Sequence, residues 1–326
     1  MRTIALALAI STLSFAALAS DFPQTFEHRY GTTVIERRPE NVVSLSFSGH
    51  DDLLALGVTP VALRYWYGDF PRGVWPWADD KLGDAEPVVL KGELDIEAIA
   101  ALQPDVIVGL WSGMTQDQYD ILSQIAPTVA AEADYTDYGT PWHVRARTLG
   151  RVVGAAEKAE ELVSAIEGQM ADIAAANPSW QGKTAAVAFH WSDAPGAYSS
   201  IDIRPLVLAE LGFTTPDAIN AAAAEANGYS ARFSKEDLSA LDTDLLIWIV
   251  TGDVDNIRSL ALRKSLKAHQ EGREVVANDL LSGAFSHATL LSLPYVLEEL
   301  VPLIEAAIDG DPSTVVSSTK EAGLLD

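Results

Sequence analysis

Residues 97–113, EAIAALQPDVIVGLWSG, align without gaps with residues 236–252, EDLSALDTDLLIWIVTG. Each copy predicts a short amphipathic helix, a tight turn and a strand whose residues are all apolar. A strand that is apolar on both faces is typical of the middle of a parallel sheet that is covered by helices. The repeat therefore predicts two similar α/β lobes in one chain.

The sequence before each copy follows the same order of strand, helix and strand. The helices end at Gly57 and Gly212, and glycine is the usual residue just beyond a helix end. Alternating strands and helices indicate right-handed β-α-β units, so the fold class that we predict is α/β, with two Rossmann-like lobes and parallel sheets. The elements in question are residues 41–48, 51–56 and 58–63 in the first half and residues 184–190, 205–211 and 213–219 in the second.

A single long helix is predicted between the two halves. Residues 155–177 contain no proline and one glycine, and their apolar residues recur at helical spacing up to Pro178. At ~1.5 Å per residue such a helix reaches about 30 Å, enough to bridge two domains. We therefore divide the chain into a first lobe at residues 20–153, a connecting helix at 154–178 and a second lobe at 179–326, and we expect small lobe motions.

The first nineteen residues predict a cleaved Sec-type signal peptide. Arg2 precedes an apolar run, and Ala17-Leu18-Ala19 supplies the small-x-small pattern of a cleavage site before Ser20. The chain has no cysteine, which excludes disulfides, cysteine zinc sites, thiol catalysis and a lipid anchor on a cysteine. We expect a periplasmic protein, with free secretion as the alternative.

The charge of the chain excludes some partners. Its 22 basic and 46 acidic residues give a formal net charge of −24, which repels nucleic acid and anionic lipid. The mature length of about 300 residues suits two domains in one monomer. No motif predicts a bound cofactor.

Aromatic side chains and arginines gather where the predicted strands end. In open parallel sheets, ligands bind beyond the carboxyl ends of the strands. Rings supply contact area, and arginine pairs with carboxylate or catecholate oxygens, so the pattern suits a flat or apolar ligand that carries negative charge. The same corners also carry Phe47, Tyr138 and Tyr229. The residues that we predict to bind ligand are Arg64, Tyr65, Trp66, Tyr67, Trp111, Trp142, Trp191, Tyr198, Arg204, Arg232, Phe285 and His287.

Several stretches resemble the binding proteins of bacterial iron-siderophore ABC transporters, in the ferric-siderophore and cobalamin class. They are YGDFPRGVWPW at 67–77, SGMTQDQY at 112–119, QIAPTV at 124–129, GTPW at 139–142 and LSLPY at 291–295. The resemblance covers nearly the whole mature chain. It implies two lobes joined by one long helix, a shallow cleft for a ferric siderophore and delivery to an ABC permease. It further implies an acidic docking residue on each lobe, here Asp51 with Asp52 on the first and Asp217 or Glu225 on the second.

Three other functions remain open at this point. A haem or cobalamin receptor would share the fold and an aromatic cleft. A free-metal receptor would need converging ligands, for which His50, His190 and His287 are the candidates. An enzyme is the third alternative, but no G-x-S-x-G, G-x-G-x-x-G or P-loop motif is present.

Overall fold

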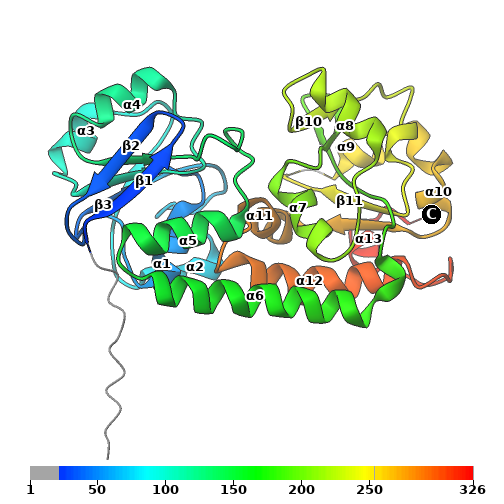
Figure 1. Ribbon diagram of the computed structural model, residues 1–326. Coiled ribbons are helices and arrows are strands. Elements are labelled where there is room, and N and C mark those ends of the chain that lie inside the picture. Colours follow the sequence, from blue (N-terminus) through cyan, green and yellow to red (C-terminus); the bar gives the residue numbers. More distant parts are fainter. Residues whose placement is uncertain (1–21, 253, 326) are drawn as a thin grey trace, which may run out of the picture.

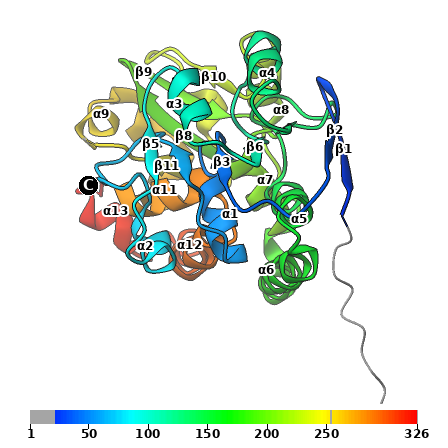
Figure 2. The ribbon, with the colours of Figure 1, turned by 90° about the vertical axis from the view of Figure 1, so that its left-hand side faces the viewer.

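The computed structural model describes residues 22–252 and 254–325, so the predicted signal peptide lies outside the described residues. Two five-stranded sheets form two lobes that stand side by side (Figure 1). This arrangement confirms the predicted fold class of two α/β lobes. A separate two-stranded hairpin, β1 (Gln24–His28) with β2 (Gly31–Ile35), flanks the first lobe (Figure 2).

The first lobe contains a wholly parallel sheet in the order β5-β4-β3-β6-β7. Its central strands β3 and β6 are buried along their whole length, as their apolar sequence requires. The helix α1 ends at Gly57, whose φ of 86° is the left-handed conformation that glycine adopts readily. The strands are β3 (Val42–Ser44), β4 (Ala62–Arg64), β5 (Val88–Leu90), β6 (Val106–Gly109) and β7 (Thr128–Ala130), and the helices are α1 (Gly49–Leu56), α2 (Pro76–Leu82), α3 (Ile96–Ala101), α4 (Gln116–Leu122) and α5 (Trp142–Val152).

The second lobe repeats this order only in part. Its sheet runs β10-β9-β8-β11-β12, in which β8, β11 and β12 are parallel and β9 and β10 are antiparallel to their neighbours. The predicted strand at residues 213–219 is reduced to one parallel bridge between Thr184 and Thr214. The strands are β8 (Ala185–Trp191), β9 (Ala194–Tyr198), β10 (Ser230–Arg232), β11 (Leu245–Ile249) and β12 (Glu274–Ala277).

The helices of the second lobe lie on both faces of this sheet (Figure 1). They are α7 (Ile203–Glu210), α8 (Asp217–Ala224), α9 (Asp255–Arg258), α10 (Lys267–Gln270), α11 (Asp279–His287), α12 (Ser292–Ala307) and α13 (Ser317–Glu321), with short 3₁₀ turns at Pro178–Trp180, Ser239–Leu241 and Ala261–Ser265. The second repeat copy thus forms a 3₁₀ turn and β11, where the first copy has α3 and β6.

One long helix, α6 (Ala156–Ala176), carries the chain from the first lobe to the second. Figure 1 shows α6 and α12 running side by side beneath both lobes, and α12 also contacts α2 of the first lobe. Residues 22–252 and 254–325 contain no helix with both the length and the apolar character that a membrane span requires.

Candidate ligand-binding site

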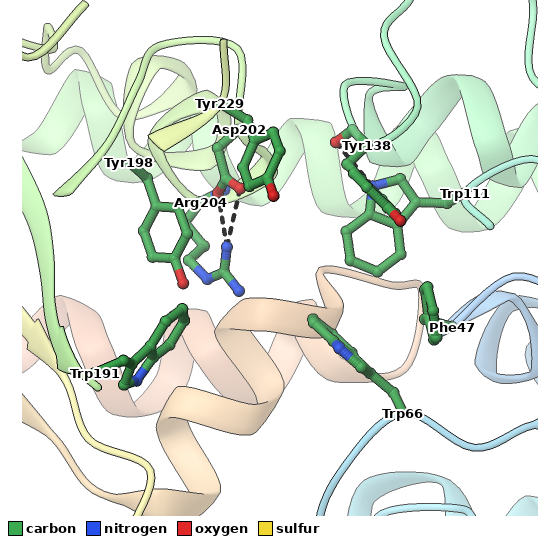
Figure 3. Close-up of a pocket in the computed structure, with 9 residues that line it drawn as sticks. All are labelled: Phe47, Trp66, Trp111, Tyr138, Trp191, Tyr198, Asp202, Arg204 and Tyr229. Atoms are coloured by element: carbon green, nitrogen blue, oxygen red, sulfur yellow. Dashed lines mark hydrogen bonds and ion pairs between the residues drawn. The ribbon is translucent and has the colours of Figure 1, made fainter. Parts of the chain in front are cut away.

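A cavity of about 300 Å³ lies between the lobes, where the carboxyl ends of the strands face each other. Phe47, Trp66 and Trp111 follow strands β3, β4 and β6 of the first lobe within three residues. Trp191 is the last residue of β8 in the second lobe, and Tyr198 ends β9, which runs antiparallel to β8 and so reaches back along it. The cavity therefore sits at the place where parallel α/β sheets bind ligands. It is lined by Phe47, Trp66, Trp111, Tyr138, Trp191, Tyr198, Asp202, Arg204 and Tyr229 (Figure 3).

The aromatic side chains form a continuous wall in the first lobe. The ring of Trp66 lies 5.1 Å from that of Trp111 and 5.8 Å from that of Phe47, and Trp111 lies 5.5 Å from Tyr138. Such edge-to-face and tilted pairs each add ~0.5–1.5 kcal/mol beyond the burial of their area. These rings therefore already pack against one another without a ligand.

The second lobe contributes rings that face this wall. Trp191 stacks on Phe189 with 4.4 Å between centroids, and its Nε1 donates to Thr251 Oγ1 at 3.1 Å. Tyr229 reaches across the cleft to Tyr138 of the first lobe, with 5.8 Å between ring centroids. This contact closes one end of the cavity with one ring from each lobe.

Among residues 22–252 and 254–325, the charged side chains that line the cavity are Asp202 and Arg204, which form an ion pair. Arg204 Nη1 donates to both carboxylate oxygens of Asp202, at 2.8 and 3.0 Å, and Arg204 Nε donates to Ser286 Oγ at 3.0 Å. Both side chains are buried, and the guanidinium lies 4.0 Å from the centroid of the Tyr198 ring. Burial raises the pKa of Asp202, and the charge of Arg204 offsets part of that effect.

The hydroxyl of Tyr198 is also part of the cavity. It is buried and has no hydrogen-bond partner within residues 22–252 and 254–325. Figure 3 shows this oxygen beside the Arg204 guanidinium and next to the Trp191 ring. Burial raises the pKa of Tyr198, so the phenol keeps its proton and can donate a hydrogen bond to a ligand.

Of the twelve predicted binding residues, the structure brings Trp66, Trp111, Trp191, Tyr198 and Arg204 together in the cavity. Four others lie near it. Arg64 donates to the Ser112 carbonyl and lies over the Phe47 ring, and Arg232 donates to the Trp191 carbonyl at 2.8 Å. The hydroxyl of Tyr65 donates to the Gly68 carbonyl, and the ring of Tyr67 contacts that of Trp66.

The other three predicted residues are packed in the protein interior. Trp142 is 2% exposed and donates to Glu210 Oε1 at 2.9 Å, and Phe285 is fully buried in the core. His287 is 1% exposed, and burial lowers its pKa well below the usual value. Its ring lies within 6 Å of the rings of Trp66, Tyr67, Trp75 and Trp77. These side chains support the cavity from behind and do not line it.

The two predicted docking aspartates of the first lobe are buried as well. Asp51 Oδ2 accepts from Trp77 Nε1 and Thr289 Oγ1, and Asp52 Oδ1 accepts from the Leu290 amide at 2.8 Å. Their exposed fractions are 0% and 1%, so neither carboxylate offers a surface to a partner in this conformation. The second-lobe candidates Asp217 and Glu225 are exposed at the two ends of α8.

Arg145 completes this buried network and was not predicted from the sequence. It projects from α5 and donates to Ser48 Oγ of the first lobe and to the carbonyls of His287 and Ala288. Its guanidinium also lies 5.4 Å from the Trp111 ring that lines the cavity. The inter-lobe network, formed by Asp51, Asp52, Arg145, Thr289 and Leu290, therefore joins the two halves of the chain directly beneath the cleft.

The histidines considered as metal ligands do not converge. The rings of His50 and His287 are 6.4 Å apart in the interior, and burial lowers the pKa of His50 to about 4. In the part of the chain that the structure describes, no group of three His, Asp or Glu side chains is placed to hold a metal ion.

Comparison with known proteins gives one consistent result. Residues 42–280 match the model of the family described as periplasmic binding protein. The "Probable siderophore-binding lipoprotein YfiY" of Bacillus subtilis is 29% identical over 286 residues, which cover 82% of this chain and 84% of that protein.

Solved structures agree with the sequence comparison. A periplasmic solute binding protein from Mycobacterium smegmatis has 32% identity and a TM-score of 0.76, covering 87% of this chain and 98% of its own. The PiaA protein of Streptococcus pneumoniae, solved in complex with ferrichrome, has 25% identity and a TM-score of 0.74, covering 88% of this chain and 99% of its own.

Proposed function

The chain belongs to the periplasmic binding protein family, which consists of substrate-binding proteins and not enzymes, and from this premise we propose that it is the siderophore-binding component of an ABC importer. It would bind a ferric siderophore between its lobes in the periplasm and deliver it to a permease. The observation that carries the proposal is the inter-lobe cavity, in which aromatic side chains from both lobes converge. The named functions of YfiY and of ferrichrome-bound PiaA support the same ligand class.

The lining of the cavity favours iron that is already chelated. Bare Fe³⁺ would need several oxygen or nitrogen ligands at one point, and the lining carboxylate, Asp202, is committed to Arg204. A chelate presents an apolar scaffold and a few oxygens, which suits rings with a small number of hydrogen-bond donors. No lining residue in the described ranges is His or Met, so the cavity lacks the commonest axial ligands of haem.

The exposed acids of the second lobe remain our docking candidates. Asp217 begins α8 and Glu225 follows its last residue, and both side chains are open to solvent. If these two acids contact the permease, the double variant Asp217→Asn, Glu225→Gln should slow permease-coupled uptake while its affinity for the siderophore stays the same.

The binding proposal is tested by tryptophan fluorescence, since Trp66, Trp111 and Trp191 line the cavity. A ferric siderophore should quench the emission at sub-micromolar concentration, whereas sugars and amino acids should not. Replacing Trp66 with Ala should weaken binding about 10- to 100-fold, the range expected for an aromatic anchor at the centre of an interface. Trp180, which is buried against Phe213 away from the cavity, supplies the matched control Trp180→Phe, which should keep the affinity.

Haem is the discriminating competitor in this assay. If haem binds with a shifted visible spectrum and ferric siderophores do not quench, the proposal is wrong and a tetrapyrrole receptor replaces it. Mass spectrometry of the protein from a periplasmic extract would test cleavage before Ser20 and, with it, the proposed location.

A further inference from the structure

The cavity that the proposed function uses has an unusual balance of charge. Among its described lining residues, seven are aromatic and the remaining two, Asp202 and Arg204, form an ion pair with each other. Because one carboxylate neutralises one guanidinium, these described lining residues together have no net charge. The whole chain carries a formal charge of −24, so the surroundings add no general attraction for an anion.

The nearby arginines do not change this balance at the cavity wall. The guanidinium of Arg64 lies 4.4 Å from the centre of the Phe47 ring and donates to the Ser112 carbonyl. Arg232 is exposed and donates to the Trp191 carbonyl. Neither side chain lines the cavity.

Two hydrogen-bond donors at the cavity have no acceptor in the described part of the chain. Arg204 Nη2 has no hydrogen-bond acceptor within the described ranges of the chain, and Figure 3 shows it directed towards the gap between Trp191 and Trp66. The Tyr198 hydroxyl, buried and without a partner, lies beside it. A ligand that supplies one or two acceptor oxygens here would satisfy both groups, which would remain unpaired beneath a ligand that lacks them.

The common ferric chelates differ sharply in charge. Three hydroxamates each carry one negative charge and leave a neutral complex with Fe³⁺, whereas three catecholates each carry two and leave a complex of charge −3. Moving a trianion from water against aromatic rings is strongly unfavourable unless unpaired cations meet it. A neutral complex brings carbonyl oxygens and apolar chain to the same surface at little desolvation cost.

We propose that this cleft selects ferric chelates of low net charge, of the trihydroxamate type, over trianionic tricatecholates, because Asp202 already neutralises the arginine that faces the ligand. The inference rests on the proposed function, since it names the class of siderophore for the same site. Asp202 is then a specificity-determining residue: it holds Arg204 in place as a donor and cancels its charge.

The first experiment compares two probes on the wild-type mature protein by fluorescence quenching and calorimetry. Ferrichrome, a neutral trihydroxamate complex, should bind at least about tenfold more tightly than ferric enterobactin, a trianionic tricatecholate. Its affinity should also change little between about 0.05 M and about 0.5 M salt, because a neutral ligand has no charge to screen. Equal or tighter binding of ferric enterobactin would overturn the charge argument but leave siderophore binding intact, and no binding of either probe would overturn the proposed function itself.

The second experiment changes the charge of the site without changing its shape. Asp202→Asn keeps a good N-terminal cap for α7 but leaves Arg204 unneutralised. The ratio of the two affinities should then shift towards ferric enterobactin by about tenfold or more. Glu161→Gln makes the same change of charge on the exposed face of α6 and should leave the ratio unchanged. If the folded Asp202→Asn protein shows an unchanged ratio of the affinities for ferrichrome and ferric enterobactin, the inference is wrong. If that variant does not fold, the salt dependence of ferrichrome binding to the wild type decides.

Discussion

The carboxyl group of Asp52 provides a quantitative test of the inter-lobe network. Its Oδ1 accepts from the Leu290 amide, while its Oδ2 is buried without a hydrogen-bond partner in the described part of the chain. Burial raises the pKa of Asp52 to about 7, and the charge of Arg145 offsets only part of this effect. Arg145 is a single cation beside two buried carboxylates, so both cannot ionise without leaving net negative charge in the interior. Asp52→Asn keeps the shape and the Leu290 contact and removes the ionisation.

The sign of the expected effect follows from proton linkage. In the unfolded chain Asp52 loses its proton near its ordinary pKa of 3.8, but in the folded protein it keeps that proton up to about pH 7. The stability that Asp52 contributes is therefore fully present below pH 4 and is lost as the pH rises through the folded-state pKa. The difference between the folded and unfolded pKa of Asp52 corresponds to at most about 4 kcal/mol. Asparagine does not ionise, so the variant escapes this loss.

The assay is urea denaturation of the wild type and of Asp52→Asn from about pH 4.5 to about pH 8. We expect the variant to gain stability relative to the wild type as the pH rises, by between about 1 and 4 kcal/mol over the range. Burial keeps the pKa values of His50 and His287 below this window in the folded protein, so these histidines titrate within it only in the unfolded chain. Asp51 is coupled to Asp52, but all three residues are present in both proteins and largely cancel in the difference. A difference that is flat, or that falls with pH, would show that Asp52 is ionised in the folded protein and that our account of the network is wrong.

Three further predictions concern how the lobes are held together. Arg145→Met should destabilise the protein by about 3–5 kcal/mol in chemical denaturation, because it removes the donor of two buried backbone carbonyls and the cation beside Asp51 and Asp52, whereas Arg147→Met, which breaks only partly exposed ion pairs, should cost under about 1 kcal/mol. Gly283→Ala should lower stability by about 1–3 kcal/mol in the same measurement, because its Cβ would lie 2.4 Å from the Trp75 ring of the first lobe. Small-angle scattering should show no change in radius of gyration beyond experimental precision when ferrichrome binds, and a clear decrease would refute the rigid connection through α6.

The sequence predicted the fold well where local pattern and tertiary role coincide. The apolar strands β6 and β11 are buried on both faces, and α1 ends at Gly57 as expected. The hairpin that joins β8 to β9 was missed, and with it the mixed character of the second sheet. Its turn consists of Ser192 and Asp193, with φ of 48° and 65°, which is the backbone of a type I′ turn. Asn-Gly or Asp-Gly usually marks such a turn, and this pair carries no glycine.

The aromatic residues of the site could be predicted from the sequence, but the ion pair between Asp202 and Arg204 could not. Rings at strand ends are visible in the sequence, but which of them face the cavity depends on how the lobes meet. Asp202 gave one local signal, an acid just before a helix, where aspartate commonly caps the first turn. Asp51 and Asp52 gave a similar signal for α1, yet they are buried because Thr289 and Leu290 cover them from 238 residues away. No window of the sequence contains that contact.

The helix α11 explains why the network beneath the cleft matters for binding. Ser286 accepts from Arg204 Nε and so fixes the cation that faces the ligand, while the carbonyl of the next residue, His287, accepts from Arg145 between the lobes. Ser286 and His287 thus connect the cavity to the inter-lobe network. A movement of one lobe against the other would have to break the Arg145 contacts or displace Ser286, and the second change would remove the acceptor of Arg204 Nε. The inter-lobe network and the position of Arg204 in the cavity therefore both depend on α11. A variant that loosens this network should also weaken discrimination between chelates of different charge.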